Sequence, residues 1–297
     1  MQPLAAWLVA RPQNAILALA GTLLLPVLQL FSGIIMVLLV LHQGARLAAI
    51  EAVIAGAILA VVSLVVGAPV MQVMVDALTT WVPALVLAAV LVATRSMMLT
   101  MQMSALIAAV AVLGFHVVVG DLTAFWEPVM TFTLEWARTN GLVEQAQVIE
   151  SSPGQMAHAL TVAFVLWGWT KAALFLFFGN RLATVAPYET GPYGRFCDLD
   201  FGRVIALLVA IASLAAFATG VASLQSVAIV LLGVFWLQGL AIVHWMQVDG
   251  ELPLFVVIAV YVLLPFLHVF LVMALAVVGY TDAWFGFRRR AVTKNEE

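Results

Sequence analysis

Long apolar runs with short polar breaks fill almost the whole chain. We predict about nine helical segments from this pattern, running roughly over 14–26, 30–42, 46–67, 78–94, 97–120, 156–180, 203–221, 223–246 and 253–279. A membrane span needs roughly 20 apolar residues, and most of these segments approach that length. The first two are short and are separated by Pro26, so they can instead be one kinked helix. The pattern predicts an all-α fold, a polytopic transmembrane helix bundle with about eight or nine membrane segments.

The longest polar interruption, 121–155, has a pattern of its own. Asp121 can cap a helix, and apolar side chains then recur at helical spacing. The apolar face carries Leu122, Phe125, Trp126, Val129, Phe132 and Trp136, and the polar face carries Glu127, Glu135 and Arg138. Asn140-Gly141 ends the pattern. We therefore predict an amphipathic helix lying on the membrane surface.

Composition agrees with a membrane protein. The chain is 65% hydrophobic and 9% charged, with a mean hydropathy of +1.15, whereas a soluble domain carries about 25% charged residues. Its 297 residues leave little room for a soluble domain. We predict a single integral membrane domain over 1–297, in four parts: N-terminal helices 14–120, the amphipathic surface loop 121–155, C-terminal helices 156–279 and a basic tail 280–297.

Charge and cysteine content narrow the location and the partners. The net charge of −3 argues against nucleic acid, which favours a basic surface. The five acidic residues and one basic residue of 121–155 favour the outside, and the loop 181–202 is expected inside. We predict a multi-pass protein of the bacterial inner (cytoplasmic) membrane, with its N-terminus inside. The single Cys197 cannot form an internal disulfide, and no Cys/His spacing indicates a metal site or a cofactor.

Lys171 is the exceptional residue, because it lies near the middle of the segment 156–180. A lysine there costs several kcal/mol on insertion scales. We interpret it as a site residue that pairs with a carboxylate or a bound anion, and the alternative is a structural lysine whose stem snorkels. Glu51 is the partner chosen by elimination. Trp167, one turn earlier, and His158 complete the candidate ligand-binding set, although a histidine in a bundle commonly makes only a structural hydrogen bond.

Small residues recur every fourth position in one segment. The stripe consists of Gly44, Ala48, Ala52, Gly56 and Ala60. Small side chains let a second helix backbone approach closely. We expect this stripe to pack against a helix of the same chain, and a membrane-protein partner or a second copy of the chain is the alternative.

No arrangement of residues indicates a reaction. The sequence contains no glycine-rich phosphate loop, no serine elbow and no HExxH-type helix. We therefore name no catalytic residues and predict that the protein is not an enzyme.

Several stretches resemble a known family. They are the run from Pro26 to Arg46, Gly194-Arg195-Phe196, the run Gln238 to His244, Tyr261-Val-Leu-Leu and the terminal Asp282-Ala-Trp-Phe-Gly-Phe-Arg288. Together they resemble the YybS-like family of bacterial membrane proteins of unknown function, over almost the whole chain. The terminal motif is the most specific part of this resemblance.

That family is distantly similar to the substrate-binding S components of energy-coupling-factor transporters and to the cell-shape protein MreD. The resemblance implies an S-component-like helical core, with a ligand near the outer face under the loop 121–155. S components dock on their transporter through an Ala-x-x-x-Ala pair in the first helix. Here Leu19 follows Ala15 and Thr22 follows Ala18 at that spacing, so the pair is absent.

Two functions follow from these observations. The first is an S-component-like protein that binds a small molecule or helps to transport it. The second is a non-transporting envelope scaffold, like MreD, that binds partner membrane proteins. Besides the lipid bilayer, the candidate partners are therefore a small-molecule ligand and a membrane protein or second copy. The residues assigned to lipid or partner contact are Trp284, Arg288, Arg289 and Arg290.

Overall fold

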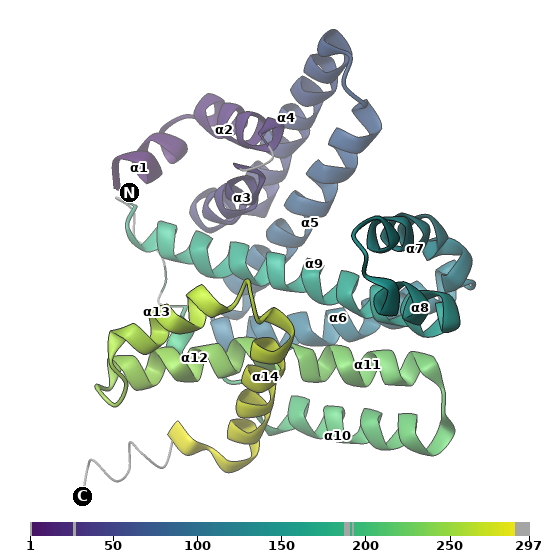
Figure 1. The fold of residues 1–297 in the computed structure, drawn as a ribbon. Helices are drawn as coiled ribbons and strands as arrows, with labels where there is room; N and C mark the ends of the chain where they lie inside the picture. Colours follow the sequence, from purple (N-terminus) through teal and green to yellow (C-terminus); the bar gives the residue numbers. More distant parts are fainter. Residues whose placement is uncertain (1, 26–27, 187–190, 192, 289–297) are drawn as a thin grey trace, which may run out of the picture. The chain divides into compact units, whose positions relative to one another are not determined.

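The computed structural model describes residues 2–25, 28–186, 191 and 193–288 (Figure 1). These residues form α-helices with short 3-10 turns such as Phe196–Asp198, and they contain no strand. In chain order the elements are α1 (Gln2–Ala10), α2 (Pro12–Leu24), α3 (Gln29–Gln43), α4 (Ala45–Val66), α5 (Val70–Thr94), α6 (Met97–Val119), α7 (Leu122–Thr139), α8 (Val143–Ser151), α9 (Pro153–Thr184), η2 (Phe196–Asp198), α10 (Gly202–Thr219), α11 (Ala222–Gly233), α12 (Phe235–Val248), α13 (Leu254–Leu263) and α14 (His268–Phe285). The predicted all-α class is confirmed.

The helices pack into two compact units. Within the described residues, the first unit takes in 2–101 and 168–196, and the second takes in 102–167 and 197–288. Helices α6 and α9 each begin in one unit and end in the other. The single membrane domain over 1–297 stays a prediction.

Seven of the described helical stretches are long and apolar enough to cross a membrane. They are α4, α5, α6, α9, α10, the continuous stretch Ala222–Val248 that contains α11 and α12, and α14. Such a set defines a multi-pass membrane protein. The number is lower than the eight or nine predicted, since α2 has only 13 residues and α3 only 15. The predicted segment 253–279 is also divided into α13 and α14 near Pro265, whose ring nitrogen cannot donate a helical hydrogen bond.

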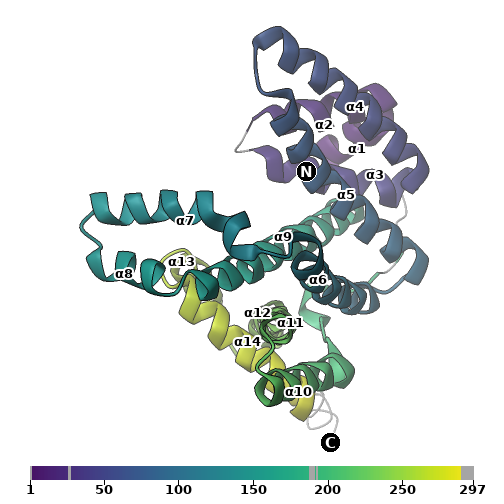
Figure 2. The ribbon, with the colours of Figure 1, turned by 90° about the vertical axis from the view of Figure 1, so that its right-hand side faces the viewer.

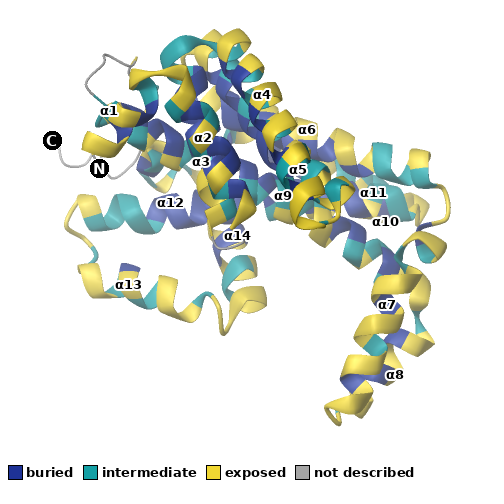
Figure 3. Cartoon of the chain, turned by 90° about the horizontal axis from the view of Figure 1, so that it is seen from above, coloured by how far each residue is buried: buried dark blue, intermediate teal, exposed yellow. Residues whose placement is uncertain are grey.

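The outer surfaces of these helices are apolar, as lipid requires. Val53 and Val65 on α4 are 72% and 81% exposed, and Phe217 on α10 is 90% exposed. Figure 3 shows exposed residues along α4, α7 and α13. Water would penalise such a surface, whereas hydrocarbon chains do not, so the exposed faces fit a lipid solvent.

Within the first unit, α3 lies at the centre. Its residues from Ile35 to Val40 are buried, and it packs against α5, α2 and α4. A Cβ placed on Gly33 would lie 2.4 Å from the Phe175 ring of α9, and one on Gly179 would lie 2.5 Å from Val37. Glycine therefore lets α3 and the C-terminal half of α9 approach closely. Helices α4 and α5 form a hairpin (Figure 2), which Gly67 permits with a positive φ of 70°.

Within the second unit, α12 is the most enclosed helix. All eight residues from Phe235 to Ile242 are buried. Helix α14 crosses α12 at Gly239 and Gly279, where the two backbones nearly touch. Helices α10 and α11 pack side by side along the same unit (Figures 1 and 2). The core of this unit is therefore built around α12.

The segment 121–155 contains the predicted helix and a second one. The Asp121 carboxylate caps α7 by accepting hydrogen bonds from the N–H groups of Thr123 at 2.9 Å and Ala124 at 3.1 Å. Gly141, with a φ of 73°, follows the end of α7, as the Asn140-Gly141 pair predicts. Four apolar side chains of α7 remain exposed: Phe125, Val129, Phe132 and Trp136. The position of this face on a membrane surface stays a prediction.

The two ends of α9 offer a test of orientation. Gln145 and Thr184 are both exposed. Gln145 precedes the N-terminal end of α9, and Thr184 is the last residue of this helix. With Cys197 replaced by serine, Gln145→Cys should react with an impermeant thiol reagent in intact cells and Thr184→Cys should not, because α9 crosses the bilayer between them. Native Cys197 is a poor reporter, since it is buried in the fold. If Thr184→Cys were labelled and Gln145→Cys were protected, the protein would have the opposite orientation to the one predicted.

Candidate functional site

Lys171 lies near the middle of α9 and is half-buried. Among the residues that the structure describes, none forms a hydrogen bond or an ion pair with its ammonium. The acid whose charge acts on it is Asp76, on the first half of α5 in the same unit. The carboxylate of Asp76 likewise accepts no hydrogen bond from a described residue. Two different spans, α9 and α5, therefore carry opposite charges that attract each other without direct contact.

Thr80 is a second polar residue on α5, close to Asp76 along the helix. Thr80 follows Asp76 by one helical turn and therefore lies on the same face of α5. Its side chain is 1% exposed, and its hydroxyl has no hydrogen-bond partner. A buried hydroxyl without a partner costs free energy that a bound polar group would recover. Asp76 and Thr80 thus supply two polar groups near one stretch of α5.

Glu51 is not the partner of Lys171, contrary to the prediction by elimination. Its side chain is 5% exposed on α4, and its Oε2 accepts a hydrogen bond from the Gln43 amide. Gln43 closes α3 and Glu51 lies in the second turn of α4, so the bond links two consecutive helices across the turn at Gly44. Asp76 lies before the predicted segment 78–94, and only the longer helix α5, which begins at Val70, places this acid inside a span.

The other two predicted ligand residues lie on the same helix as Lys171, Trp167 one turn before it and His158 nearer the start of α9. Trp167 is 67% exposed. Trp167 therefore presents most of its ring outward, as an aromatic side chain on a lipid-facing surface does. His158 lies in the second turn of α9 and pairs with His116 of α6. The structure thus adds Asp76, whose charge acts on Lys171, to the candidate group, and the roles of Trp167 and His158 stay predictions.

The small-residue stripe is not the position of closest helix approach. Only Ala48 of its five members is buried, and Gly44, Ala52, Gly56 and Ala60 are half-buried. The buried face of α4 is instead formed by Ala48, Glu51, Ala55, Leu59 and Ser63. A Cβ on Gly56 would lie 3.7 Å from the Trp81 ring of α5, which is an ordinary van der Waals contact. The stripe therefore borders the α4–α5 contact within the chain, and its predicted close backbone approach is wrong.

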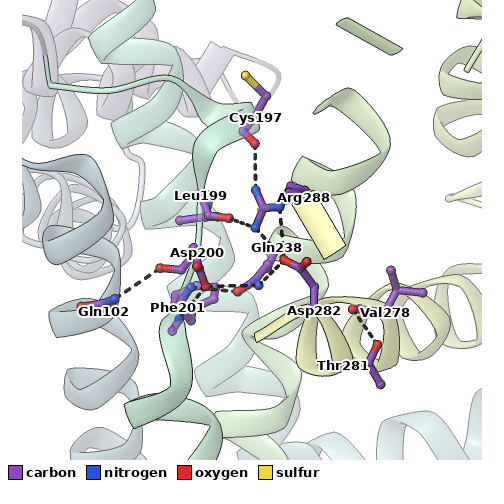
Figure 4. A network of polar contacts seen from close by, with 11 residues as sticks. Gln102, Cys197, Leu199, Asp200, Phe201, Gln238, Val278, Thr281, Asp282 and Arg288 are labelled. Carbon is purple, nitrogen blue, oxygen red and sulfur yellow. Dashed lines mark hydrogen bonds and ion pairs between the residues drawn. The ribbon is translucent and has the colours of Figure 1, made fainter. Parts of the chain in front are cut away.

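A buried polar network joins the end of α14 to the start of α10 (Figure 4). Asp282 is 3% exposed, and its Oδ2 accepts hydrogen bonds from the Arg288 Nη2 at 2.8 Å, the Arg288 Nε at 3.1 Å and the Gln238 Nε2 at 3.0 Å. Arg288 also donates to the carbonyl oxygens of Cys197 at 2.9 Å and Leu199 at 2.8 Å. One guanidinium therefore fixes both the end of α14 and the segment that leads into α10.

The local sequence explains this geometry. Gly286 adopts a left-handed φ of 60° directly after α14, and its N–H donates to the Asp282 carbonyl oxygen at 2.7 Å. The chain then turns back, so that Arg288 reaches the carboxylate six positions earlier. On the other side, the Gln238 Oε1 accepts the N–H of Phe201 at 2.8 Å. The terminal motif Asp282 to Arg288 is thus a structural clasp.

The prediction that Arg288 contacts lipid or a partner is wrong, because Arg288 belongs to this clasp. The Arg288 side chain is only 11% exposed and is ion-paired with Asp282, so it does not face lipid phosphates. A buried arginine with four hydrogen bonds has few donors left for a headgroup. Trp284 is 36% exposed and makes an edge contact with Tyr280. Arg289 and Arg290 lie outside the described residues.

An open pocket lies between α7 and α8, in the segment predicted to cover a ligand. Its volume is about 450 Å³, and its wall includes Asp121, Glu127 and Glu150. Glu150 is ion-paired with Arg138, and Asp121 is engaged as the α7 cap. Lys171 is not among the residues that line it. The described residues contain no group of three or more His, Cys, Asp or Glu side chains that could hold a metal ion.

The fold and these contacts define a multi-pass membrane protein with an unpaired charge inside one span and a buried ionic clasp. No family model, curated protein or solved structure matches the chain.

Proposed function

We propose that the protein binds a small molecule with an anionic group through Lys171, as a non-enzymatic, S-component-like membrane protein. The observation that carries the proposal is the ammonium of Lys171, which lies in mid-span without a hydrogen bond or ion pair to a described residue. An uncompensated charge in hydrocarbon is costly, and a bound anion would compensate it.

Asp76 shapes the affinity of this site. Its carboxylate attracts the ammonium without direct contact, so it reduces the cost of the charge without occupying the hydrogen-bond positions of the amine. It also repels an incoming anion. The site therefore retains donors for a ligand, and its affinity is held below that of an isolated ammonium.

The scaffold function has less support. It depended on a small-residue stripe open to a partner and on a basic tail. The stripe borders the α4–α5 contact of the same chain at Gly56 and Trp81, and Arg288 of the tail is engaged in the clasp with Asp282. Gly56 and Arg288 are therefore engaged within the chain, and the rest of the basic tail lies outside the described residues. The resemblance to YybS-like proteins, which are distantly similar to both S components and MreD, does not separate the two functions and supplies no residue of the site.

The test is anion binding to purified protein and its variants. Thermal shifts would be recorded with a panel of small carboxylates and organic phosphates, and compounds that copurify would be identified by mass spectrometry. For a compound that binds, Lys171→Met should weaken binding roughly ten- to hundredfold, the loss expected for a charge-assisted hydrogen bond. Asp76→Asn should strengthen binding, since it removes a competing negative charge.

Two matched variants keep the test specific. Arg181→Met removes a cation from the exposed end of the same helix, and Glu51→Gln removes an acid that does not act on Lys171. Both should leave binding unchanged. If Lys171 and Asp76 are only a structural pair, Asp76→Asn should lower thermal stability and the panel should give no shift that depends on Lys171. That outcome would overturn the proposal.

A further inference from the structure

Two histidines from different helices meet in the second unit. His116 lies in the last turn of α6 and His158 in the second turn of α9. The His116 Nε2 and the His158 Nδ1 are 3.1 Å apart, and the two rings are nearly parallel, with an interplanar angle of 18°. The ring centroids are 5.2 Å apart, close to the sum of this nitrogen–nitrogen distance and the two ring radii. The imidazoles therefore point at each other through their nitrogens, the arrangement of a hydrogen bond.

The surroundings fix where the hydrogens of the neutral pair lie. The Nδ1 of His116 is 2.8 Å from the Val112 carbonyl oxygen. A carbonyl can only accept, so this Nδ1 carries the hydrogen and donates it. The Nε2 of a neutral His116 is then an acceptor. His158 must therefore donate from its Nδ1, which leaves the lone pair of its Nε2 unused by His116.

We propose that the His116–His158 pair is a proton-binding site that takes up a single proton, at the Nε2 of His158. His116 acts as the positioning residue, because its bond to Val112 presents a lone pair to His158. The first proton leaves the hydrogen bond intact and turns it into a charge-assisted one, which is stronger than a neutral bond. A second proton would have to occupy the Nε2 of His116, break the bond and place two like charges side by side.

The neighbouring polar groups do not supply a competing charge. From α11, the Ser226 hydroxyl donates to the Ala222 carbonyl oxygen and lies 3.5 Å from the His116 Nε2. From α7, Trp126 donates to Thr161, one turn after His158 on α9. The acids of α7 and α8 are used elsewhere: Asp121 caps α7, Glu150 pairs with Arg138, Glu127 lines the open pocket, and Glu135 and Glu144 are exposed. No described carboxylate is hydrogen-bonded to either imidazole.

Because of where the His116–His158 pair lies, proton uptake should affect the stability of the neighbouring segment that contains α7 and α8. The segment from Asp121 to Ser152, which contains α7 and α8, joins the end of α6 to the start of α9. The His116–His158 bond ties together the two helix ends from which that segment extends. Proton uptake therefore strengthens the tie at the base of α7 and α8, and this segment should open less readily as the pH falls.

The test uses nuclear magnetic resonance of the full chain in lipid nanodiscs, with ¹⁵N-labelled histidine. In the neutral pair both His116 and His158 should carry their hydrogen on Nδ1, and on acidification His158 should gain its proton at Nε2 while its Nδ1–H bond to His116 persists. Assignment would come from single replacements. His116→Gln should alter the titration of His158, whereas His268→Gln, at an exposed position on α14, should not.

A second readout separates a proton switch from a structural contact. Hydrogen-exchange protection of α7 and α8, corrected for intrinsic rates, should increase as His158 titrates in the native protein. His158→Gln should abolish that increase. If both histidines become cationic together, if His116 carries its hydrogen on Nε2, or if protection is independent of pH, the proposal is wrong.

Discussion

Replacing Gly239 with alanine is expected to force α12 and α14 apart and to lower the melting temperature sharply. A Cβ at this position would lie 2.0 Å from the Leu275 carbonyl oxygen. The obstacle is backbone, so no side chain can rotate to make room. Overpacking in a core typically costs about 1–3 kcal/mol and sometimes more, and a backbone-to-backbone clash belongs at the upper end.

Gly279, on the other helix of this crossing, allows a second test of the same close approach. A Cβ at Gly279 would lie 2.2 Å from the Phe235 carbonyl oxygen and 2.8 Å from the Gly239 nitrogen. Gly279→Ala should therefore destabilise the protein to a similar degree. Because the two glycines occupy one crossing, the double variant should cost less than the sum of the single variants.

The control is Gly114→Ala on α6 in the same unit, where nothing lies within 4 Å of an added Cβ. Alanine is the better helix former, so this variant should melt at an equal or slightly higher temperature. Melting would be followed in detergent by the exposure of buried thiol or tryptophan. Equal melting temperatures for Gly239→Ala and Gly114→Ala would show that the α12–α14 crossing is looser than described.

Replacing Arg288 with methionine is the second change for which we expect a large effect. It removes the cation bonded to Asp282 and leaves a carboxylate that is 3% exposed, with only Gln238 as a donor. Breaking a buried ion pair from one side costs about 3–5 kcal/mol. The carbonyl oxygens of Cys197 and Leu199 also lose their donor, so the segment before α10 should exchange its amide hydrogens faster.

The double variant Arg288→Met, Asp282→Asn distinguishes a buried charge from lost packing. It removes the stranded carboxylate, and it should recover much of the stability that Arg288→Met loses. Arg181→Met, at an exposed position, should change the melting temperature little. A double variant no more stable than Arg288→Met would indicate that the guanidinium acts mainly through the two carbonyl oxygens.

Local features of the helices could be predicted from the sequence. Asp121 caps α7 and the Asn140-Gly141 pair ends it because capping and chain reversal depend on neighbouring residues. The apolar runs place most spans to within a few residues, because hydrophobicity is also a property of neighbouring residues. Pro265 also marks the division of 253–279 into α13 and α14, because proline cannot donate a helical hydrogen bond.

The partners of the candidate site could not be predicted. Elimination paired Lys171 with Glu51, whereas the charge that acts on it belongs to Asp76. His116 and His158, 42 positions apart, appeared unrelated in the sequence and meet through their ring nitrogens. The interpretation of Arg288 as a lipid contact was reasonable for a basic tail residue. It proved wrong because Gly286 turns the chain back onto Asp282.

The sequence by itself determined that this is a multi-pass helical membrane protein, because length and hydrophobicity are local properties that the bilayer selects directly. Only the tertiary structure decided which face of each helix is inside. In a soluble helix, polarity marks the outer face, but lipid and core are equally apolar, so the contrast disappears. Gly56 and Gly239 consequently look alike in the sequence. One borders a side chain at 3.7 Å, and the other permits two backbones to nearly touch.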